Sequence, residues 1–328
     1  MSDSIETYKN DIFNKLFEYS FNTLAMRAFV IQYECCKPYR RYCELLHKSP
    51  DNVRQIRNIP FLPIEFFKNN QIVCGEKHRT SVFKSSGTTG TNSYHYVHDL
   101  NLYDRNLDEG FRSFYGAPAQ FRFIAILPGY IERNDASLIY MLRQLIAAGG
   151  HSESGIYSSG DDEVFLKIQK LEAVAQPYFL WAVSHALMKF AEQYPMPVQH
   201  CIVMETGGSK GMGKEIIRSE MHGFLKKSFS VKTIHSEYGM TELLSQAYAV
   251  SDGIFRPTPR MKVLVRDATD PLCISEAGTG MLNIIDLANI HSCCFIGTSD
   301  VGTVQSDGSF ELLGRADNSD ARGCNQMV

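Results

Sequence analysis

The sequence lacks a strong charge of either sign. Its 328 residues include 33 lysine and arginine residues and 36 aspartate and glutamate residues, which give a formal net charge of −3. Proteins that bind nucleic acid usually carry a basic patch or stripe, so this composition predicts no nucleic-acid partner. It also provides no polybasic cluster that would anchor the chain to a membrane surface.

The sequence also lacks long apolar runs and recognisable cysteine motifs. Met1 to Asn10 are polar and contain no apolar core of a signal peptide, and no run is long enough to span a membrane. Nine cysteines are present, an odd number, and their spacing fits neither a zinc site nor a disulfide framework. These absences predict a cytoplasmic protein whose thiols are free.

What the sequence contains is an alternation of strand and helix patterns. The first fifty residues or so are expected to be helical, because apolar residues from Ile5 to Tyr19 recur at steps of three and four. Short β-rich runs follow at Ile72–Cys74 and Ser81–Phe83. We then predict strands at Phe121–Leu127, Tyr178–Val183, Gln199–Met204 and Val231–Ile234. Between them we predict helices from Asp135 to Ala148, from Asp161 to Ala175, from Ser184 onward and from Lys214 to Lys227, with Asp135, Asp161 and Ser184 as caps.

From about Leu243 the pattern changes to short strands and turns. Strands are expected at Met261–Val265, Met281–Asp286 and Val301–Gln305, and Asp307-Gly308 marks a hairpin. The expected fold class is therefore α/β, with doubly wound parallel sheets, covering helices and a β-rich C-terminal subdomain over about 243–315.

Two glycine-containing loops could bind phosphate. Ser85-Ser86-Gly87-Thr88-Thr89-Gly90-Thr91 combines hydroxyls with backbone amides that glycine leaves accessible, a surface suited to anions, although a surface turn has the same composition. Gly208 to Lys214 has the spacing of a P-loop. That motif requires serine or threonine next, to hold magnesium, and Glu215 stands there instead.

Two later segments offer groups for a nucleotide. Just past a predicted strand, Tyr238 could stack on a base, Thr241 could contact phosphate and Glu242 could bind Mg²⁺. A helix start with solvated glutamates is the simpler interpretation of that segment alone. In the loop expected at 297–302, Asp300 could accept the hydroxyls of a ribose, and Arg315 could meet ribose or phosphate oxygens; a plain turn and a surface charge are the alternatives.

Histidines near these loops lack an acid partner by spacing, so we expect them to be structural: His95, His98 and His235. A serine-hydrolase function for Ser86 has no support, since the Gly-x-Ser-x-Gly pattern is absent around it.

Taken in order, the segments resemble the adenylate-forming superfamily of acyl-CoA synthetases, adenylation domains and firefly luciferase. The matching motifs are Ser85 to Gly90, Tyr238-Gly239-Met240-Thr241-Glu242, Thr298-Ser299-Asp300 and Gly314-Arg315-Ala316-Asp317. Within it the chain looks most like the LuxE-type acyl-protein synthetases, through Ile59 to Phe67, Glu205 to Lys210 and Arg322-Gly323-Cys324.

The resemblance implies ATP and Mg²⁺ as cofactors and assigns residue roles. It places the ATP phosphates on Ser86, Gly87, Thr88 and Thr89, and adenine beside Gly207, Gly208 and Tyr238. It gives Thr241 the α-phosphate, Glu242 the Mg²⁺, and Asp300 and Arg315 the ribose. Cys324 would receive the acyl group from acyl-AMP. The implied partners are a carboxylic acid, most naturally a fatty acid, and an acyl-carrier protein, CoA or an acyl reductase.

The resemblance also implies a domain arrangement. Residues 1–315 would form the large domain of the adenylate-forming fold and 316–328 a short hinge-like tail, with the usual C-terminal lid domain and its catalytic lysine absent. Two other functions stay open at this point. One is a P-loop nucleotide hydrolase using 208–214, and the other is a non-catalytic homologue that keeps a nucleotide or acyl pocket.

Overall fold

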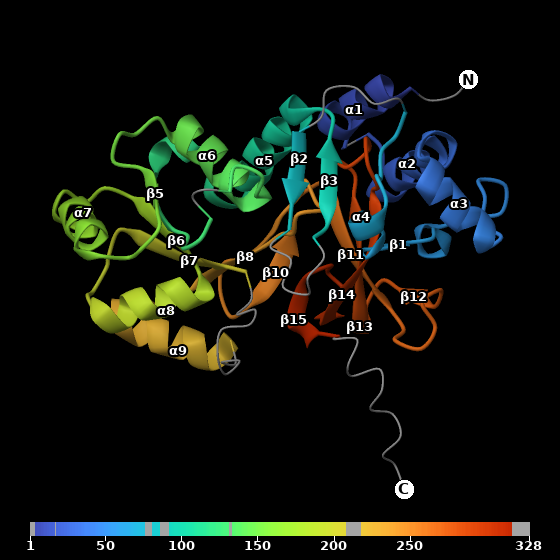
Figure 1. Ribbon diagram of the computed structural model, residues 1–328. Coiled ribbons are helices and arrows are strands. Elements are labelled where there is room, and N and C mark those ends of the chain that lie inside the picture. The colour runs from blue at the N-terminus through green and yellow to red at the C-terminus, as the bar shows by residue number, and fades with distance from the viewer. Residues whose placement is uncertain are drawn as a thin grey trace, which may run out of the picture.

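The computed structural model describes residues 4–16, 18–75, 81–85, 92–130, 133–207 and 218–316. Among these residues, thirteen strands form one large mixed sheet, and β2 and β3 form a separate two-stranded sheet. Helices cover the sheet on both sides of its parallel half, and further helices pack against its antiparallel half (Figure 1). The predicted α/β class is confirmed.

The large sheet runs in the order β12-β11-β13-β14-β15-β10-β9-β8-β7-β6-β4-β5. Its parallel half consists of β5 (Gly155–Tyr157), β4 (Arg122–Ile126), β6 (Tyr178–Val183), β7 (Cys201–Thr206) and β8 (His235–Tyr238). Its antiparallel half consists of β9 (Ala247–Ala249), β10 (Ile254–Pro257), β15 (Phe310–Arg315), β14 (Phe295–Val304), β13 (Gly278–Asp286), β11 (Met261–Arg266) and β12 (Ile274–Ser275). The remaining strands are β1 (Leu62–Pro63), which pairs in parallel with β14, and the antiparallel pair β2 (Ser81–Lys84) and β3 (Tyr94–Val97).

The described helices fall into an N-terminal group and a central group. The N-terminal helices are α1 (Ile5–Asn14), α2 (Phe21–Cys35), α3 (Lys37–Leu45) and α4 (Phe66–Asn69). The central helices are α5 (Leu100–Tyr115), α6 (Ser137–Gly149), α7 (Asp162–Ala173), α8 (Ser184–Gln193) and α9 (Arg218–Phe229). Single 3₁₀ turns occur at Ile56–Asn58 and Pro118–Gln120. Among all the residues that the structure describes, no helix is long and apolar enough to cross a membrane.

Among the central parallel strands, β6 forms where the sequence is continuously apolar, because both of its faces are buried. All six residues of β6 are buried, as expected for a parallel strand covered on both faces. Figure 1 shows α5 and α6 on one side of these strands and α8 and α9 on the other. The predicted strands at 121–127, 178–183 and 199–204 are confirmed within one or two residues, as is the Asp161 cap of α7, whose carboxylate accepts hydrogen bonds from the amides of Glu163 and Val164.

The N-terminal helices share a core with the antiparallel half of the sheet. The ring of Phe295 in β14 stacks on Tyr39 at 5.9 Å between centroids and meets Phe29 at 6.4 Å. β1 extends this contact into the sheet, since Leu62 and Pro63 pair with Ile296 and Gly297. The N-terminal helices therefore pack directly against the antiparallel half of the sheet, and β1 joins it.

Two predicted helix caps are wrong. The Asp135 side chain does not cap α6, which begins at Ser137; its carboxylate lies 3.6 Å from Arg133 Nε, and its carbonyl accepts a hydrogen bond from Lys84. Ser184 begins α8 without capping it, and its hydroxyl lies 2.9 Å from Glu205 Oε2. The Asp135 side chain thus contacts its near neighbour Arg133, and the Ser184 side chain takes part in a tertiary contact, so neither is available as a cap.

Several predicted strand and loop positions are also wrong. The strand expected at 231–234 begins at His235, because Val231 closes the end of α9 through its hydrogen bond to Lys226. The run 72–74 is not a strand; its backbone meets the 291–292 turn through Cys74 N–His291 O and Ser292 Oγ–Ile72 O. The segment 297–302, expected as a loop, lies within β14, and Ser236 to Tyr238 lie within β8 rather than after a strand.

The cysteine prediction is wrong for one pair. Cys35 and Cys74 form a disulfide, with 4.8 Å between their Cα atoms. The backbone amide of Gly75 also donates to the carbonyl of Cys35 over 3.1 Å, so the fold brings the end of α2 beside this segment. A separation of 39 residues in the sequence gave no sign of this proximity.

Candidate functional site

Among the described residues, some of the predicted nucleotide residues lie where the two halves of the sheet join. β8 is parallel to β7 on one side and antiparallel to β9 on the other. Ligands of open α/β sheets bind beyond the carboxyl ends of parallel strands, where the strand order changes. Tyr238 is the last residue of β8, and Gly207, the first residue after β7, turns away with a φ of 72°.

Three predicted residues from three strands contact one another. The hydroxyl of Tyr238 in β8 donates to Asp300 Oδ2 in β14 over 2.7 Å, and Arg315 Nε in β15 lies 3.2 Å from Asp300 Oδ1. The Asp300 side chain is 14% exposed and that of Arg315 is 43% exposed. A carboxylate oriented in this way, at the edge of solvent, suits the hydroxyls of a sugar.

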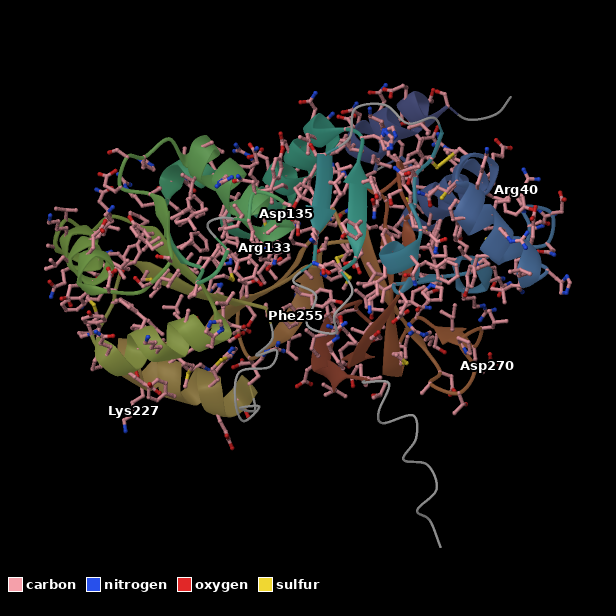
Figure 2. All side chains as sticks on the ribbon, viewed as in Figure 1. Arg40, Arg133, Asp135, Lys227, Phe255 and Asp270 are labelled. Atoms are coloured by element: carbon pink, nitrogen blue, oxygen red, sulfur yellow. A yellow bond between two sulfur atoms is a disulfide. The ribbon has the colours of Figure 1, made fainter. Side chains whose placement is uncertain are left out.

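Tyr238 is itself buried, with 7% of its surface exposed. Its ring meets Phe255 at 6.0 Å and Phe310 at 5.5 Å between centroids, and Figure 2 marks the position of Phe255 in the middle of the molecule. Burial, with the neighbouring Asp300 carboxylate, raises the pKa of Tyr238 well above its ordinary value. The phenol therefore remains a hydrogen-bond donor to Asp300.

The backbone around Asp300 is held by side chains from other elements. The amide of Asp300 donates to Thr298 Oγ1 over 3.1 Å, and the guanidinium of Arg266 donates to the carbonyl of Thr298. Ser299 Oγ donates to Glu65 Oε1 over 3.1 Å. Glu65 belongs to the 59–67 segment, so the N-terminal part of the chain contacts the residue next to Asp300.

The backbone of Thr241 and Glu242 is held by His95 and Asn289. His95 Nδ1 lies 2.8 Å from the carbonyl oxygen of Thr241, and Asn289 Nδ2 donates to the carbonyl of Glu242 over 2.8 Å. His95 Nε2 lies 2.9 Å from Asn289 Oδ1. Burial lowers the pKa of His95 to about 4. The Glu242 residue is 4% exposed and Thr241 is partly exposed.

Sequence reasoning left His95 without a functional role and did not consider Asn289. His95 lies in β3, four residues after Thr91 in the sequence, whereas Thr241 and Asn289 are 146 and 194 residues away from it. Only the tertiary fold brings these groups together, so no local motif could have revealed them.

The flanks of the predicted phosphate loop are closed by hydrogen bonds. The amide of Ser85 donates to the carbonyl of Ser93 over 3.1 Å, and Asn92 Nδ2 donates to the carbonyl of Ser85 over 2.8 Å. Arg133 adds hydrogen bonds to the carbonyls of Lys84 and Ser85, at 2.8 and 3.0 Å. Figure 2 shows Arg133 near the end of β2. Arg133 is a cation at this site that the sequence analysis did not identify.

Several predicted site residues lie outside the described part of the chain. They are Ser86, Gly87, Thr88, Thr89, Gly208 and Cys324, together with the whole P-loop-like run 208–214. Their roles, and the division into a 1–315 domain and a 316–328 tail, stay predictions.

A buried acidic pair lies beneath the ends of β7 and β8. Glu205 Oε1 is 3.3 Å from Arg218 Nε, and Glu237 accepts a hydrogen bond from Thr206 Oγ1. Burial raises the pKa of Glu237 to about 7, and the nearby Glu205 carboxylate adds to this increase. Glu237 is thus a proton-binding group one residue before Tyr238.

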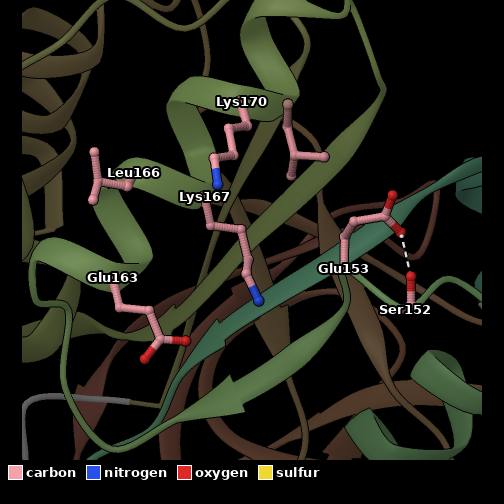
Figure 3. A pocket seen from close by; sticks show the side chains of 7 residues that line it. Ser152, Glu153, Glu163, Leu166, Lys167 and Lys170 are labelled. Carbon is pink, nitrogen blue, oxygen red and sulfur yellow. Dashed lines mark hydrogen bonds between the residues drawn. The ribbon is translucent and has the colours of Figure 1, made fainter.

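A surface hollow elsewhere on the protein has no relation to these residues. It lies between the β5 region and α7 (Figure 3) and is lined by Ser152, Glu153, Glu163, Leu166, Lys167, Lys170 and Leu171. None of the predicted site residues is among them, and its charges are mixed.

The metal prediction rests on a single carboxylate. Within the described ranges, no group of three or more His, Cys, Asp or Glu residues could hold a metal ion. Mg²⁺ in nucleotide enzymes is usually bound by one or two carboxylates plus phosphate oxygens and water. The buried Glu242, beside Thr241, fits that kind of site.

Sequence comparison identifies one protein family. Residues 9–107 match the family model "Acyl-protein synthetase, LuxE". A 71-residue stretch is 38% identical to the long-chain-fatty-acid–luciferin-component ligase of Photorhabdus luminescens, covering 21% of this chain and 60% of that protein. The segment that matches the family model includes Glu65 and His95, which contact the candidate site.

Structural comparison identifies the fold of the larger part of the chain. ATP-bound MatB from Rhodopseudomonas palustris aligns with a TM-score of 0.55 and 17% identity, over 74% of this chain and 50% of MatB. O-succinylbenzoate coenzyme A synthetase from Bacillus subtilis, in complex with ATP and magnesium, aligns with a TM-score of 0.51 and 16% identity, over 74% of this chain and 53% of that enzyme.

The matched regions span 50 to 60% of these relatives' own length. At 16–17% identity the structural likeness establishes the fold, and the family match establishes the relationship of the N-terminal third. The predicted resemblance is confirmed: the chain has the fold of these ligases, and residues 9–107 are similar to the LuxE-type acyl-protein synthetases.

Proposed function

We propose that this protein is an AMP-forming acid–thiol ligase, which uses ATP to activate a carboxylic acid, most naturally a fatty acid, and passes the acyl group to a thiol. The observation that carries the proposal is the contact among Tyr238, Asp300 and Arg315, contributed by three different strands, with the buried Glu242 shortly after Tyr238 in the chain. The name of the Photorhabdus relative, a long-chain-fatty-acid ligase, supports a fatty acid as substrate.

In the proposed complex the described residues hold the nucleoside. Asp300 would accept hydrogen bonds from the ribose hydroxyls, because its carboxylate is oriented by Tyr238 and Arg315 and is partly open to solvent. Adenine would lie beside Gly207 and Tyr238. Thr241 would donate its hydroxyl to the α-phosphate, and Arg133 would add positive charge near the predicted phosphate loop.

Glu242 would hold Mg²⁺, which, when bound, offsets negative charge on the phosphates. The other phosphate contacts are proposed for Ser86, Gly87, Thr88 and Thr89, with Gly208 beside adenine. The protein's contribution is mainly to position the two reactants and to stabilise the charge that develops.

The proposed reaction has two steps. A carboxylate oxygen of the acid attacks the α-phosphorus of ATP; the new P–O bond forms as the bond to the β-phosphate bridging oxygen breaks, and pyrophosphate leaves. The product is acyl-AMP. A thiolate then attacks the acyl carbon, and AMP leaves as the thioester forms. The attacking species is the thiolate because the neutral thiol is a much weaker nucleophile.

We propose Cys324 as the acceptor thiol, on the basis of its place in the Arg322-Gly323-Cys324 sequence. The buried thiols among the described residues are poor alternatives: burial raises the pKa of Cys36 to about 11 and of Cys201 to about 12, whereas Cys273 is exposed. Incubation with ATP, Mg²⁺ and a labelled fatty acid should then label the protein, and Cys324→Ser should not be labelled. Equal labelling would assign the acceptor elsewhere, such as CoA, an acyl-carrier protein or an acyl reductase partner.

The test of the activation step is acid-dependent exchange of labelled pyrophosphate into ATP, over a panel of fatty and aromatic acids. Asp300→Ala should lower kcat/KM for ATP by about 10- to 100-fold, because hydrogen bonds to a charged group contribute about 1.5–3 kcal/mol. The matched control is Asp307→Ala, which removes an exposed carboxylate from the turn of the same hairpin. We expect it to retain the wild-type rate.

Two results would contradict the proposal. Release of ADP without acid-dependent exchange would favour a hydrolase that uses 208–214. Nucleotide binding without exchange for any acid would indicate a non-catalytic homologue.

A further inference from the structure

A chain of buried polar groups connects β3 to the Thr241–Glu242 backbone. His95 is 0% exposed and Asn289 is 1% exposed. His95 Nδ1 lies 2.8 Å from the carbonyl oxygen of Thr241, and its Nε2 lies 2.9 Å from Asn289 Oδ1; both partners are acceptors, so the neutral ring donates its single hydrogen to one of them and only contacts the other. The amide of Asn289 holds the next carbonyl, that of Glu242, over 2.8 Å. Two successive peptide carbonyls are thus fixed from outside their own segment.

Each of the two holding residues is itself fixed in place. The His95 ring packs edge-on against Phe67 of α4, with 6.0 Å between centroids. Asn289 lies in the turn 287–294, and the fully buried Gln32 of α2 binds this turn. Gln32 Nε2 donates to the carbonyls of Asn289, Ile290 and Ser292 at 3.1 to 3.2 Å, and its Oε1 accepts from the amide of Cys294 over 2.8 Å.

The position of these carbonyls decides where two side chains point. Thr241 and Glu242 follow β8 without belonging to a helix or strand, so no hydrogen-bonded ladder fixes their backbone. A metal-binding carboxylate requires closely defined placement, because Mg²⁺ demands near-ideal octahedral geometry. Loss of a group that orients a metal ligand from behind typically lowers metal affinity by about 10- to 100-fold.

We propose that His95 and Asn289 are positioning residues, which hold the Thr241–Glu242 backbone so that the Glu242 carboxylate and the Thr241 hydroxyl are placed for Mg·ATP. The inference rests on the proposed function, since Glu242 is the proposed metal ligand. It also gives the N-terminal segment a role in the site, because His95 and Gln32 both lie within residues 9–107, which match the LuxE family model.

The test measures how much Mg²⁺ is needed for ATP to raise the thermal unfolding temperature of the protein, a readout independent of turnover. His95→Ala should raise the Mg²⁺ concentration for half-maximal stabilisation by about 10-fold or more, the usual effect of losing a group that orients a metal ligand. His95→Asn should stay close to wild type, because its amide can donate from nearly the position of Nδ1. Asn289→Ala should behave like His95→Ala.

The matched control is His235→Ala. His235 is partly buried, with its pKa lowered to about 4 by burial, but it lies at the opposite end of β8 and contacts Tyr115. We expect a lower unfolding temperature and an unchanged Mg²⁺ requirement. If Asn289→Ala and His95→Ala also lowered the unfolding temperature without changing the Mg²⁺ requirement, the inference would be overturned. His95 and Asn289 would then have a structural role only. If His95→Ala does not fold, His95→Asn and Asn289→Ala decide.

The failure of the proposed function would look different. Wild-type protein would then show neither stabilisation by Mg·ATP nor acid-dependent pyrophosphate exchange, and the inference would fall with it. Stabilisation of the wild type, with an unchanged Mg²⁺ requirement in both substituted proteins, would overturn the positioning role alone.

Discussion

Glu237 shows how one residue can make stability depend on pH. The side chain is buried beneath the end of β8, accepts a hydrogen bond from Thr206 and has its pKa raised from 4.5 to about 7 by burial. The folded protein therefore holds a proton between these pH values that the unfolded chain has already released. Where the folded state binds more protons, the free energy of unfolding falls as pH rises.

We predict that Glu237→Gln removes this pH dependence. The amide imitates the protonated carboxyl and never ionises, so the variant should gain stability over wild type as pH rises from 4.5 to 7. The difference should approach about 3 kcal/mol, the free-energy equivalent of that change in pKa. Urea unfolding at several pH values measures it, and a difference that stays constant across this range would contradict the prediction.

Tyr238 provides a second test at the same scale. Tyr238→Phe removes the hydrogen bond to Asp300 and keeps the ring packing against Phe255 and Phe310. KM for ATP should rise about fivefold, the equivalent of one hydrogen bond of about 1 kcal/mol. Tyr248→Phe is the control, since the buried Tyr248 hydroxyl has no hydrogen-bond partner among the described residues. Equal KM values for the two variants would contradict the prediction and show that the Tyr238 hydroxyl does not contribute to nucleotide binding.

At the scale of elements, the N-terminal helices are joined to the rest of the fold by more than packing. The disulfide between Cys35 and Cys74 links the end of α2 to the segment before β2. The backbone amide of Cys74 donates a hydrogen bond to the carbonyl of His291, which lies in the same turn as Asn289. α2 also holds that turn through Gln32. The arrangement of α2 and the 287–294 turn therefore determines the support beneath Glu242.

We predict that Cys35→Ser with Cys74→Ser lowers the free energy of unfolding by up to about 4 kcal/mol, because the bond closes a loop of roughly 40 residues in the unfolded chain. Wild-type protein under reducing conditions should lose a similar amount. Cys273→Ser, at an exposed free thiol, should lose little. Urea unfolding with and without reductant measures all three, and a wild type insensitive to reductant would contradict the assignment of the bond.

The elements that the sequence predicts well are those in which periodicity reflects burial. β6 is apolar throughout and buried throughout, and the helices of the first fifty residues carry apolar spacing that matches their core faces. β14 and β8 were misplaced because Thr298 to Asp300 and Ser236 to Tyr238 contain polar residues typical of loops. These side chains are satisfied within the sheet, as in Tyr238–Asp300 and Thr298–Leu282, and local patterns do not record such pairing.

At the scale of the whole molecule, the candidate site is assembled from distant parts of the chain. The motif positions at 238–242, 300 and 315 were identified from the sequence, and the structure brings Tyr238, Asp300 and Arg315 into contact. The supporting residues Gln32, Glu65, His95 and Asn289 were not identified as parts of the site. Each acts through long-range contacts that only the tertiary fold brings together.

The central claim is that these parts form one site in which an acid attacks the α-phosphate of ATP. The most direct measurement is to identify the nucleotide formed from ATP labelled in its α-phosphate, with and without a panel of carboxylic acids. The account predicts labelled acyl-AMP and AMP that appear only with acid, together with pyrophosphate, and strongly reduced formation in Asp300→Ala. Labelled ADP, or AMP formed equally without acid, would contradict it.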